Sequence, residues 1–190
     1  MNIGLYKEPV NPLFPNYRGL YRQNNLIDLY ENGSKYLTEF IKRYYSDSID
    51  GIYLQYNHKN KLQLISLYQE LKHENWSGEI ILFTDNTALA CPDDCELIGY
   101  DICADSKYYS PLGDGFLEVY DENDLFFSEM DFNIFKRYKD NINENGLFSV
   151  YYAALEFSQY CKMINDKYEH MVESENNYRP FAVFAFKQSI

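Results

Sequence analysis

Short strand-like runs alternate with segments of helical periodicity through residues 1–84, and this alternation constrains the fold more than any other feature. NIGLY at 2–6, GIYLQY at 51–56 and EIILFT at 79–84 are β-branched or apolar runs typical of strands. Between them, residues 34–46 and 61–74 place apolar side chains at helical spacing. The order strand, helix, strand, helix, strand predicts a partly parallel sheet with helical crossovers.

Further strands and one long helix follow in the second half of the chain. The runs ELIGYDIC at 96–103, GFLEVY at 115–120 and RPFAVFAF at 179–186 favour strands, and residues 146–164 give the strongest helical pattern. No linker, repeat or low-complexity tract divides the 190 residues, so we expect one domain over 1–190. Its predicted class is α/β or α+β, with a mixed sheet and flanking helices. The expected core-facing helix residues are Leu37, Phe40, Ile41, Tyr44, Leu64, Leu67, Tyr68, Leu71, Leu147, Val150, Tyr151, Ala154 and Cys161, behind a Ser34 cap on the first helix.

The net charge of −12 is concentrated in one stretch of the chain. Residues 91–131 hold twelve acidic residues against Lys107 alone, a charge of −11, whereas residues 1–90 carry −1 and residues 132–190 carry zero. Such a stretch repels phosphate backbones and anionic membranes, so neither a nucleic acid nor a membrane is an expected partner. It attracts a cationic partner instead. A solvated region whose charge only aids solubility is the alternative.

The N-terminal MNIGLYKEP lacks the cationic run and apolar core of a signal peptide. No apolar run approaches the roughly 20 residues needed to span a bilayer. The four cysteines are then expected to be reduced thiols of a cytoplasmic protein, at Cys91, Cys95, Cys103 and Cys161.

Metal and cofactor chemistry has little support in the residue pattern. Cys91 and Cys95 are spaced as a zinc-ligand pair, but no second cysteine or histidine pair accompanies them. The Asp-rich segments lack the spacing of a calcium loop, and Gly113-Asp114-Gly115 lacks the glycine and lysine positions of a phosphate loop. We therefore expect no metal and no cofactor.

Two carboxylates are the candidates for catalysis. Asp101 and Asp105 share a face on an extended stretch, and a histidine brought in by the fold would complete a hydrolase. Nothing in the sequence tunes either carboxylate, and no nucleophile elbow of the form G-x-S-x-G is present. The sequence therefore predicts a binding protein with no catalytic residues, and a hydrolase remains the alternative.

The stretch ELIGYDICADSKYYSPLGDGF resembles a pattern in bacterial immunity proteins of polymorphic toxin and contact-dependent inhibition systems. In that pattern a strand reaches a G-[YF]-D-[IV] turn, followed by a small or acidic residue and a Tyr-containing loop. The matching residues here are Gly99, Tyr100, Asp101, Ile102, Ala104 and Asp105.

The resemblance implies a cytoplasmic, non-enzymatic protein that binds a cognate toxin C-terminal domain, often a basic nuclease. Stoichiometric occlusion would follow, with acids meeting Lys and Arg on the toxin and tyrosines forming hot-spot contacts. An interaction protein of another bacterial defence system is a further alternative. The expected partner-binding residues are Asp93, Asp94, Glu96, Asp105, Tyr108, Tyr109, Asp114, Asp121, Glu122 and Asp124.

Overall fold

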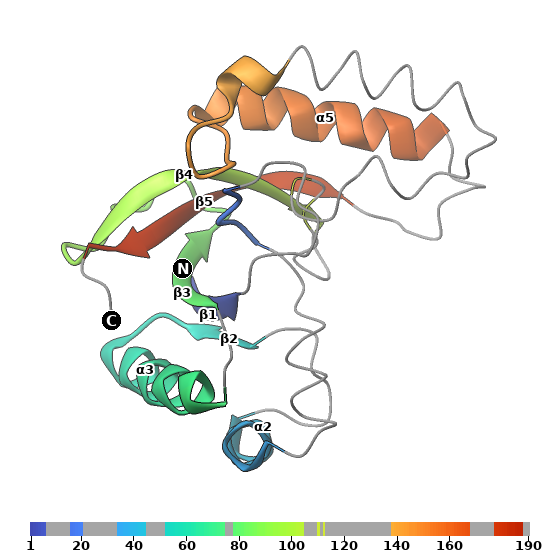
Figure 1. The fold of residues 1–190 in the computed structure, drawn as a ribbon. Coiled ribbons are helices and arrows are strands. Elements are labelled where there is room, and N and C mark those ends of the chain that lie inside the picture. The colour runs from blue at the N-terminus through green and yellow to red at the C-terminus, as the bar shows by residue number, and fades with distance from the viewer. Residues whose placement is uncertain are drawn as a thin grey trace.

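Five strands form one sheet in a computed structural model of the chain, with the order β2-β1-β3-β5-β4 and antiparallel pairing throughout (Figure 1). The strands are β1 (Asn2–Tyr6), β2 (Ile52–Gln55), β3 (Glu79–Thr84), β4 (Cys95–Ala104) and β5 (Tyr178–Phe186). The helices are α2 (Lys35–Tyr44), α3 (His58–His73) and α5 (Tyr151–Lys167), with a 3₁₀ turn at Lys139–Asn141. The structure describes residues 1–6, 16–20, 34–44, 52–74, 78–104, 110, 112, 138–167 and 177–187.

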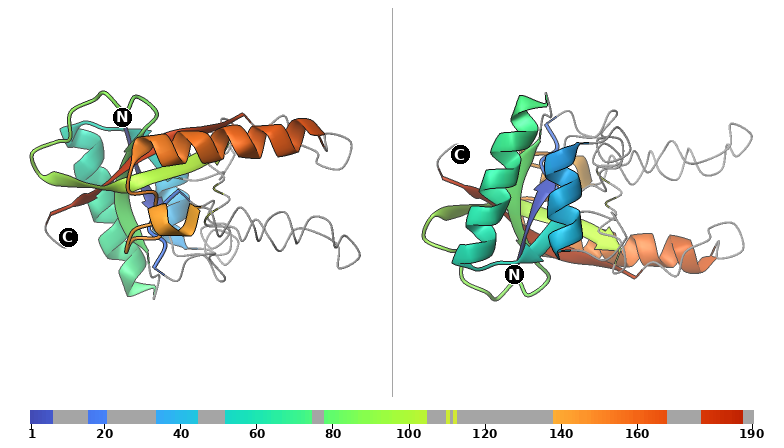
Figure 2. Two further views of the ribbon diagram at one scale, coloured as in Figure 1. Left: turned by 90° about the horizontal axis from the view of Figure 1, so that it is seen from above. Right: turned by 90° about the horizontal axis from the view of Figure 1, so that it is seen from below.

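Helices cover both faces of the sheet, so the domain has three layers. Helices α2 and α3 lie on one face, and α5 lies on the other, where it runs along β4 and β5 (Figures 1 and 2). A sheet covered on both sides needs strands that are apolar on both faces. Strands β3 and β5 meet this need, because their interior residues are almost all buried.

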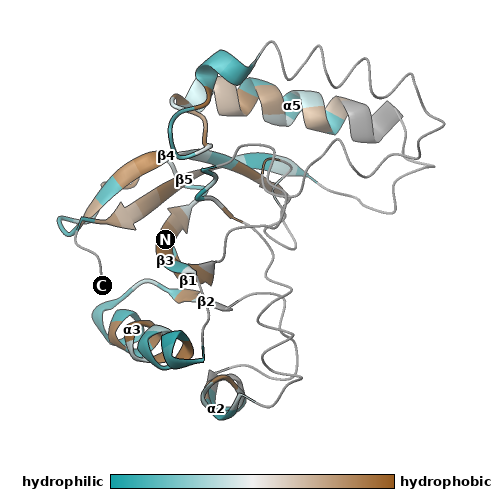
Figure 3. Ribbon diagram, viewed as in Figure 1, coloured by the Kyte–Doolittle hydropathy of each residue, from teal (hydrophilic) through white to brown (hydrophobic). Residues whose placement is uncertain are grey.

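The alternation of side chains along β3 builds two separate hydrophobic clusters. Ile80 and Leu82 pack with α2 and α3, whereas Ile81 and Phe83 pack on the α5 side. The hydropathy colouring in Figure 3 shows β3 as a largely hydrophobic strand in the middle of the sheet. Burial of this kind contributes about 25 cal/mol for each Å² of apolar surface removed from water.

Helices α2 and α3 each begin after a residue whose side chain caps the helix N-terminus. Ser34 Oγ accepts a 3.4 Å hydrogen bond from Leu37 N, which confirms the expected cap of α2. Helix α3 begins three residues before the expected start, since the Asn57 side chain accepts a 2.9 Å bond from Asn60 N. The predicted apolar stripe of α3 is confirmed, with four residues buried: Leu64, Leu67, Tyr68 and Leu71.

A bulge in β4 changes which way its side chains face. The register with β5 shifts between Leu97 and Gly99, so Cys95 packs in the α2–α3 cluster but Cys103 packs in the α5-side cluster. One extra residue reverses the facing of everything that follows it in a strand. The residues after the bulge, including Asp101, therefore have a different orientation from the one that simple alternation from Cys95 predicts.

Residues 142–148 cover the outer edge of β4 beside the bulge. Tyr100 and Phe148 exchange two backbone hydrogen bonds of 2.9 Å, and Asn143 Nδ2 donates to Ile98 O at 2.7 Å. Gly99 has φ +148° and lies so close to this segment that an added Cβ would be 2.7 Å from Leu147 Cβ. An edge strand covered in this way is protected from pairing with another chain.

The substitution Gly99→Ala is expected to lower the free energy of unfolding by about 2 kcal/mol, because the methyl group meets Leu147 and the backbone conformation disfavours any Cβ. Urea denaturation followed by circular dichroism measures this change. The control Glu96→Ala, at an exposed position of the same strand, should change stability by about 0.5 kcal/mol or less. Equal stability of the two variants would contradict the close approach at Gly99.

The α+β alternative of the predicted fold class is confirmed, with helices flanking the sheet, but the expected parallel pairing is wrong. Strands β2 and β3 do point the same way and are connected through α3, yet β1 lies between them and pairs antiparallel with both. Strand propensity does not tell which strand inserts between two others. The expected strand at 115–120 lies outside the described residues, as do the side chains of Ile41 and Tyr44.

The expected start of the last helix is also wrong. Helix α5 begins at Tyr151, because residues 138–149 form a 3₁₀ turn and a bridge to β4 instead of a helix. Leu147 and Phe148 are buried from this non-helical segment, whereas Val150 is 51% exposed and is not a core residue. Within the helix, the expected core positions Ala154 and Cys161 are buried.

Candidate functional site

Among the described acids of the 91–131 stretch, Asp101 is the one that lies in the interior. Its relative exposure is 0%, and it pairs with Phe181 of β5 on the sheet face that α5 covers. The bulge at Leu97/Gly99 puts it there. Buried carboxylates are uncommon and need hydrogen bonds to be tolerated.

Four donors satisfy the Asp101 carboxylate. Oδ2 accepts from the Tyr17 hydroxyl and from Leu20 N, each at 2.6 Å. Oδ1 accepts from the Ser110 hydroxyl at 2.6 Å and from Ile102 N at 2.8 Å. Tyr17 and Leu20 lie more than 80 residues before Asp101, and Ser110 lies nine residues after it, so one side chain joins residues 16–20 and Ser110 to β4.

Close packing accompanies these bonds. A Cβ on Gly19 would overlap the Asp101 carboxylate and would lie 2.6 Å from the Tyr17 ring, so only glycine fits at this position. The segment is held from outside by Arg18, whose guanidinium donates to both carboxylate oxygens of Glu79 and to Asn145 Oδ1. Residues 16–20 are thus fixed on the inner side by their contacts with the Asp101 carboxylate and on the outer side by the hydrogen bonds of Arg18.

Burial dominates the electrostatics of Asp101. Removal from water raises the pKa of Asp101 to about 6, although its hydrogen bonds with Ser110, Tyr17 and the backbone act in the opposite direction. Burial, and then the neighbouring Asp101 charge, raises the pKa values of both Tyr17 and Cys103. Asp101 is therefore held close to its titration point near neutral pH.

The hydroxyl of Tyr17 faces two acceptors but carries one hydrogen. Its oxygen lies 2.6 Å from Asp101 Oδ2 and 2.7 Å from Leu20 O. When Asp101 is ionised, the hydrogen that serves the carboxylate is not available to the carbonyl. When Oδ2 carries a proton, it can donate to Tyr17, which in turn donates to Leu20 O. The geometry thus accommodates the protonated form of Asp101.

Asp101 is a buried carboxylate that holds separate segments of the chain together by hydrogen bonds. It is not exposed as a catalytic group. Four protein donors occupy its oxygens, and the carboxylate is inaccessible to a substrate in this arrangement. Asp105, its expected catalytic partner, lies outside the described residues. Sequence reasoning left open whether Asp101 was structural, exposed or catalytic, and the hydrogen bonds identify the first role.

The acidic residues before β4 are exposed, and one of them is neutralised. Asp94 forms an ion pair with Lys61 of α3 and accepts a 3.4 Å bond from the Tyr56 hydroxyl, and the bond from Lys61 lowers the pKa of Asp94. Asp93 and Glu96 are exposed, and Lys187 Nζ bonds the backbone carbonyl of Asp93, not its carboxylate. Of the three expected contact residues at 93–96, Asp93 before β4 and Glu96 within it therefore carry charge that no described residue pairs.

Seven expected contact residues lie outside the part of the chain that the structure describes: Asp105, Tyr108, Tyr109, Asp114, Asp121, Glu122 and Asp124. Two neighbours of these residues are described, and both are buried. Ser110 is 0% exposed and bonds Asp101, and Leu112 is 2% exposed within the α5-side cluster. The acidic stretch is therefore attached to the core at these two points.

The cysteines do not gather in space. Cys91 is exposed, Cys95 and Cys103 are buried on opposite faces of the sheet, and Cys161 is buried on α5. Burial raises the pKa of Cys95 to about 12, with the nearby Asp94 charge acting in the same direction. Within the described ranges, no three His, Cys, Asp or Glu side chains are grouped as a metal site.

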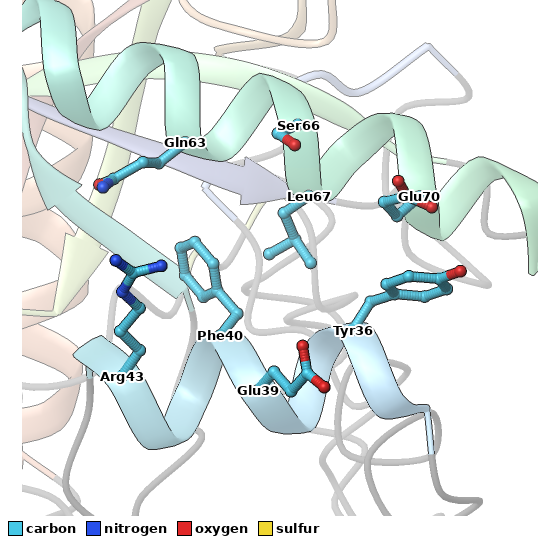
Figure 4. Close-up of a pocket in the computed structure, with 8 residues that line it drawn as sticks. All are labelled: Tyr36, Glu39, Phe40, Arg43, Gln63, Ser66, Leu67 and Glu70. Atoms are coloured by element: carbon cyan, nitrogen blue, oxygen red, sulfur yellow. The ribbon is translucent and has the colours of Figure 1, made fainter.

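A groove between α2 and α3 was not expected from the sequence. It has a volume of about 250 Å³, with polar side chains around a floor made by Phe40 and Leu67 (Figure 4). Polar residues beside the two apolar stripes were the available signal, but the sequence does not show that α2 and α3 pack against each other. The groove is lined by Tyr36, Glu39, Phe40, Arg43, Gln63, Ser66, Leu67 and Glu70.

Comparison with known proteins found no matching family model, no matching curated protein and no matching solved structure. No helix in the described part of the chain is long and apolar enough to cross a membrane.

Proposed function

We propose that this chain is an immunity-type binding protein, which neutralises a basic toxin domain by stoichiometric occlusion. The observation that carries the proposal is the attachment of the acidic stretch 91–131 to the folded core. Ser110 and Leu112 lie within that stretch and are buried, and Asp101 holds Ser110 by a 2.6 Å bond. A charge of −11 carried on anchored chain can present a defined surface, which a free tail cannot.

The role of Asp101 also supports binding over hydrolysis. A general acid or base must reach the proton it transfers. Asp101 is instead enclosed by Tyr17, Ser110 and two backbone amides. This geometry removes the residue on which the hydrolase alternative depended most.

The exposed carboxylates of Asp93 and Glu96 are the described part of the proposed contact surface. Charged groups at the rim of an interface mainly accelerate association and select the partner. The acids from Asp105 to Asp124 carry charge of the same sign in the sequence. A cationic toxin surface is the complementary partner.

The test is co-purification with the C-terminal domain of a secreted toxin encoded beside this gene, followed by stopped-flow association. We expect a one-to-one complex whose association rate falls at least about tenfold between about 0.05 M and about 0.5 M salt. The double variant Asp93→Asn/Glu96→Gln should slow association further at low salt. Glu144→Gln, an exposed acid on the α5 side of the sheet, is the matched control. Absence of a complex with that domain would refute the proposal.

A further inference from the structure

The groove between α2 and α3 has chemically different ends. Arg43 and Gln63 lie together at one end, and Tyr36 and Glu70 face each other at the other end, with Glu39 beside them (Figure 4). Each helix spans seven residues between the ends, so the groove is about 10 Å long at a rise of 1.5 Å per residue.

Apolar side chains make the floor between these ends. Phe40 and Leu67 are 8% and 5% exposed, and they separate the amide end from the acidic end. A ligand along the groove would therefore meet an amide and a cation, then apolar carbon, then two carboxylates.

One buried polar atom of the groove is unsatisfied, and two of its carboxylates are without an ion pair. The Gln63 Oε1 atom is buried and has no hydrogen-bond partner, which is costly for an acceptor. Glu39 and Glu70 form no ion pair with any described residue. The groove thus has an acceptor without a hydrogen-bond partner at one end, and at the other end two carboxylates without an ion pair among the described residues.

We infer that this groove receives an arginine side chain of the basic partner, with the arginine backbone at the Gln63 end and its guanidinium between Glu39 and Glu70. This inference rests on the proposed function for the source of the arginine. After a rotation of the Gln63 side chain, its Oε1 atom would accept a backbone N–H of the partner. The methylene stem would lie on Phe40 and Leu67, as stems of long cationic side chains do on apolar surface.

The direction of the arginine follows from charge. Arg43 repels a guanidinium at its own end, whereas Glu39 and Glu70 attract it at the other end. A planar guanidinium can pair with carboxylates and stack on the ring of Tyr36. Lys35 Nζ already lies 4.8 Å from the centroid of that ring, so a stacked guanidinium would displace this lysine or use the other face of the ring.

The test uses a defined probe and the isolated full-length chain. N-acetylarginine N-methylamide carries the side chain with a backbone amide on each side, and its citrulline counterpart is a neutral control of the same shape. Titration of ¹⁵N-labelled protein should give saturable shifts of the amides of Tyr36, Phe40, Leu67 and Glu70, with a Kd on the order of millimolar. Citrulline should bind at least about fivefold more weakly.

Variants then locate the probe. Glu70→Gln should weaken arginine binding at least about threefold, and Glu144→Gln on the other side of the sheet should leave it unchanged. Saturable shifts at the groove that depend on Glu70 support the inference, even if no toxin partner is found. Absence of such shifts, or equal binding by citrulline, overturns it. The proposed function would survive that outcome if the toxin complex forms and Glu70→Gln leaves its affinity unchanged.

Discussion

Asp101→Ala is expected to lower the free energy of unfolding by about 4 kcal/mol, one of the largest effects of any single substitution in this chain. The change removes the acceptor of four buried donors, from Tyr17, Leu20, Ile102 and Ser110. Each buried donor left without a partner costs roughly 1–3 kcal/mol, and relaxation or entry of water recovers part of that sum. Urea denaturation at neutral pH measures the difference.

Asp94→Ala provides the matched control, because it removes an acid that is exposed and paired with Lys61 at the surface. Exposed ion pairs are worth about 0–1 kcal/mol, so this variant should unfold close to wild type. Similar losses for the two variants would show that the buried network does not contribute more than a surface pair. Hydrogen exchange adds a local readout, since the amide of Leu20 should lose protection only in Asp101→Ala.

The second large effect is the contribution of Asp101 to the dependence of stability on pH. Burial raises the pKa of its carboxyl in the folded state to about 6, from an ordinary value near 3.8. The folded state therefore binds the proton more tightly than the unfolded state does. The resulting stabilisation is fully present below about pH 4 and is lost as the pH rises through about 6. A shift of this size corresponds to about 3 kcal/mol in all.

Asp101→Asn supplies the reference that does not titrate at this position. The stability of wild type relative to Asp101→Asn should be greatest near pH 4 and should decline toward pH 7, as measured by urea denaturation at a series of pH values. Other acids, such as Asp94, contribute equally to both proteins and cancel in the difference. Parallel stability profiles would mean that Asp101 has the same pKa folded and unfolded. The titratable groups that face Asp101 are Tyr17 and Cys103, whose raised pKa values keep both neutral through this range.

Hydrophobic periodicity predicted the described helices and strands well where the buried residues follow the local sequence pattern. Strand β3 matches its expected range of 79–84, and the buried face of α3 contains the four leucine and tyrosine positions that helical spacing indicated. The pairing of strands was harder to predict from the sequence, because the insertion of β1 between β2 and β3 depends on contacts between distant residues. The same limit explains the wrong prediction for Val150. This residue continues the helical pattern, but Phe148 pairs with Tyr100, so the helix begins only after Val150.

The charge of the candidate site could be predicted from the sequence, but the positions of its side chains could not. Composition located the acidic stretch, and the structure then separated its described members by environment. The burial of Asp101 depends on the register shift at Leu97/Gly99 and on donors 81 and 84 residues earlier in the chain, which no local pattern contains. The pairing of Asp94 with Lys61 likewise requires the packing of α3 beside the turn before β4.

The place of β5 in the sheet has a consequence for biosynthesis. It is the last of the five strands to leave the ribosome, yet it alone connects β3 to β4. Until β5 emerges, β4 lacks its neighbour in the sheet, and the face of β4 that carries Asp101 has no Phe181 beside it. Contacts between residues so distant along the chain are slow to form. The nascent protein therefore completes its buried carboxylate network only after most of the chain has been made.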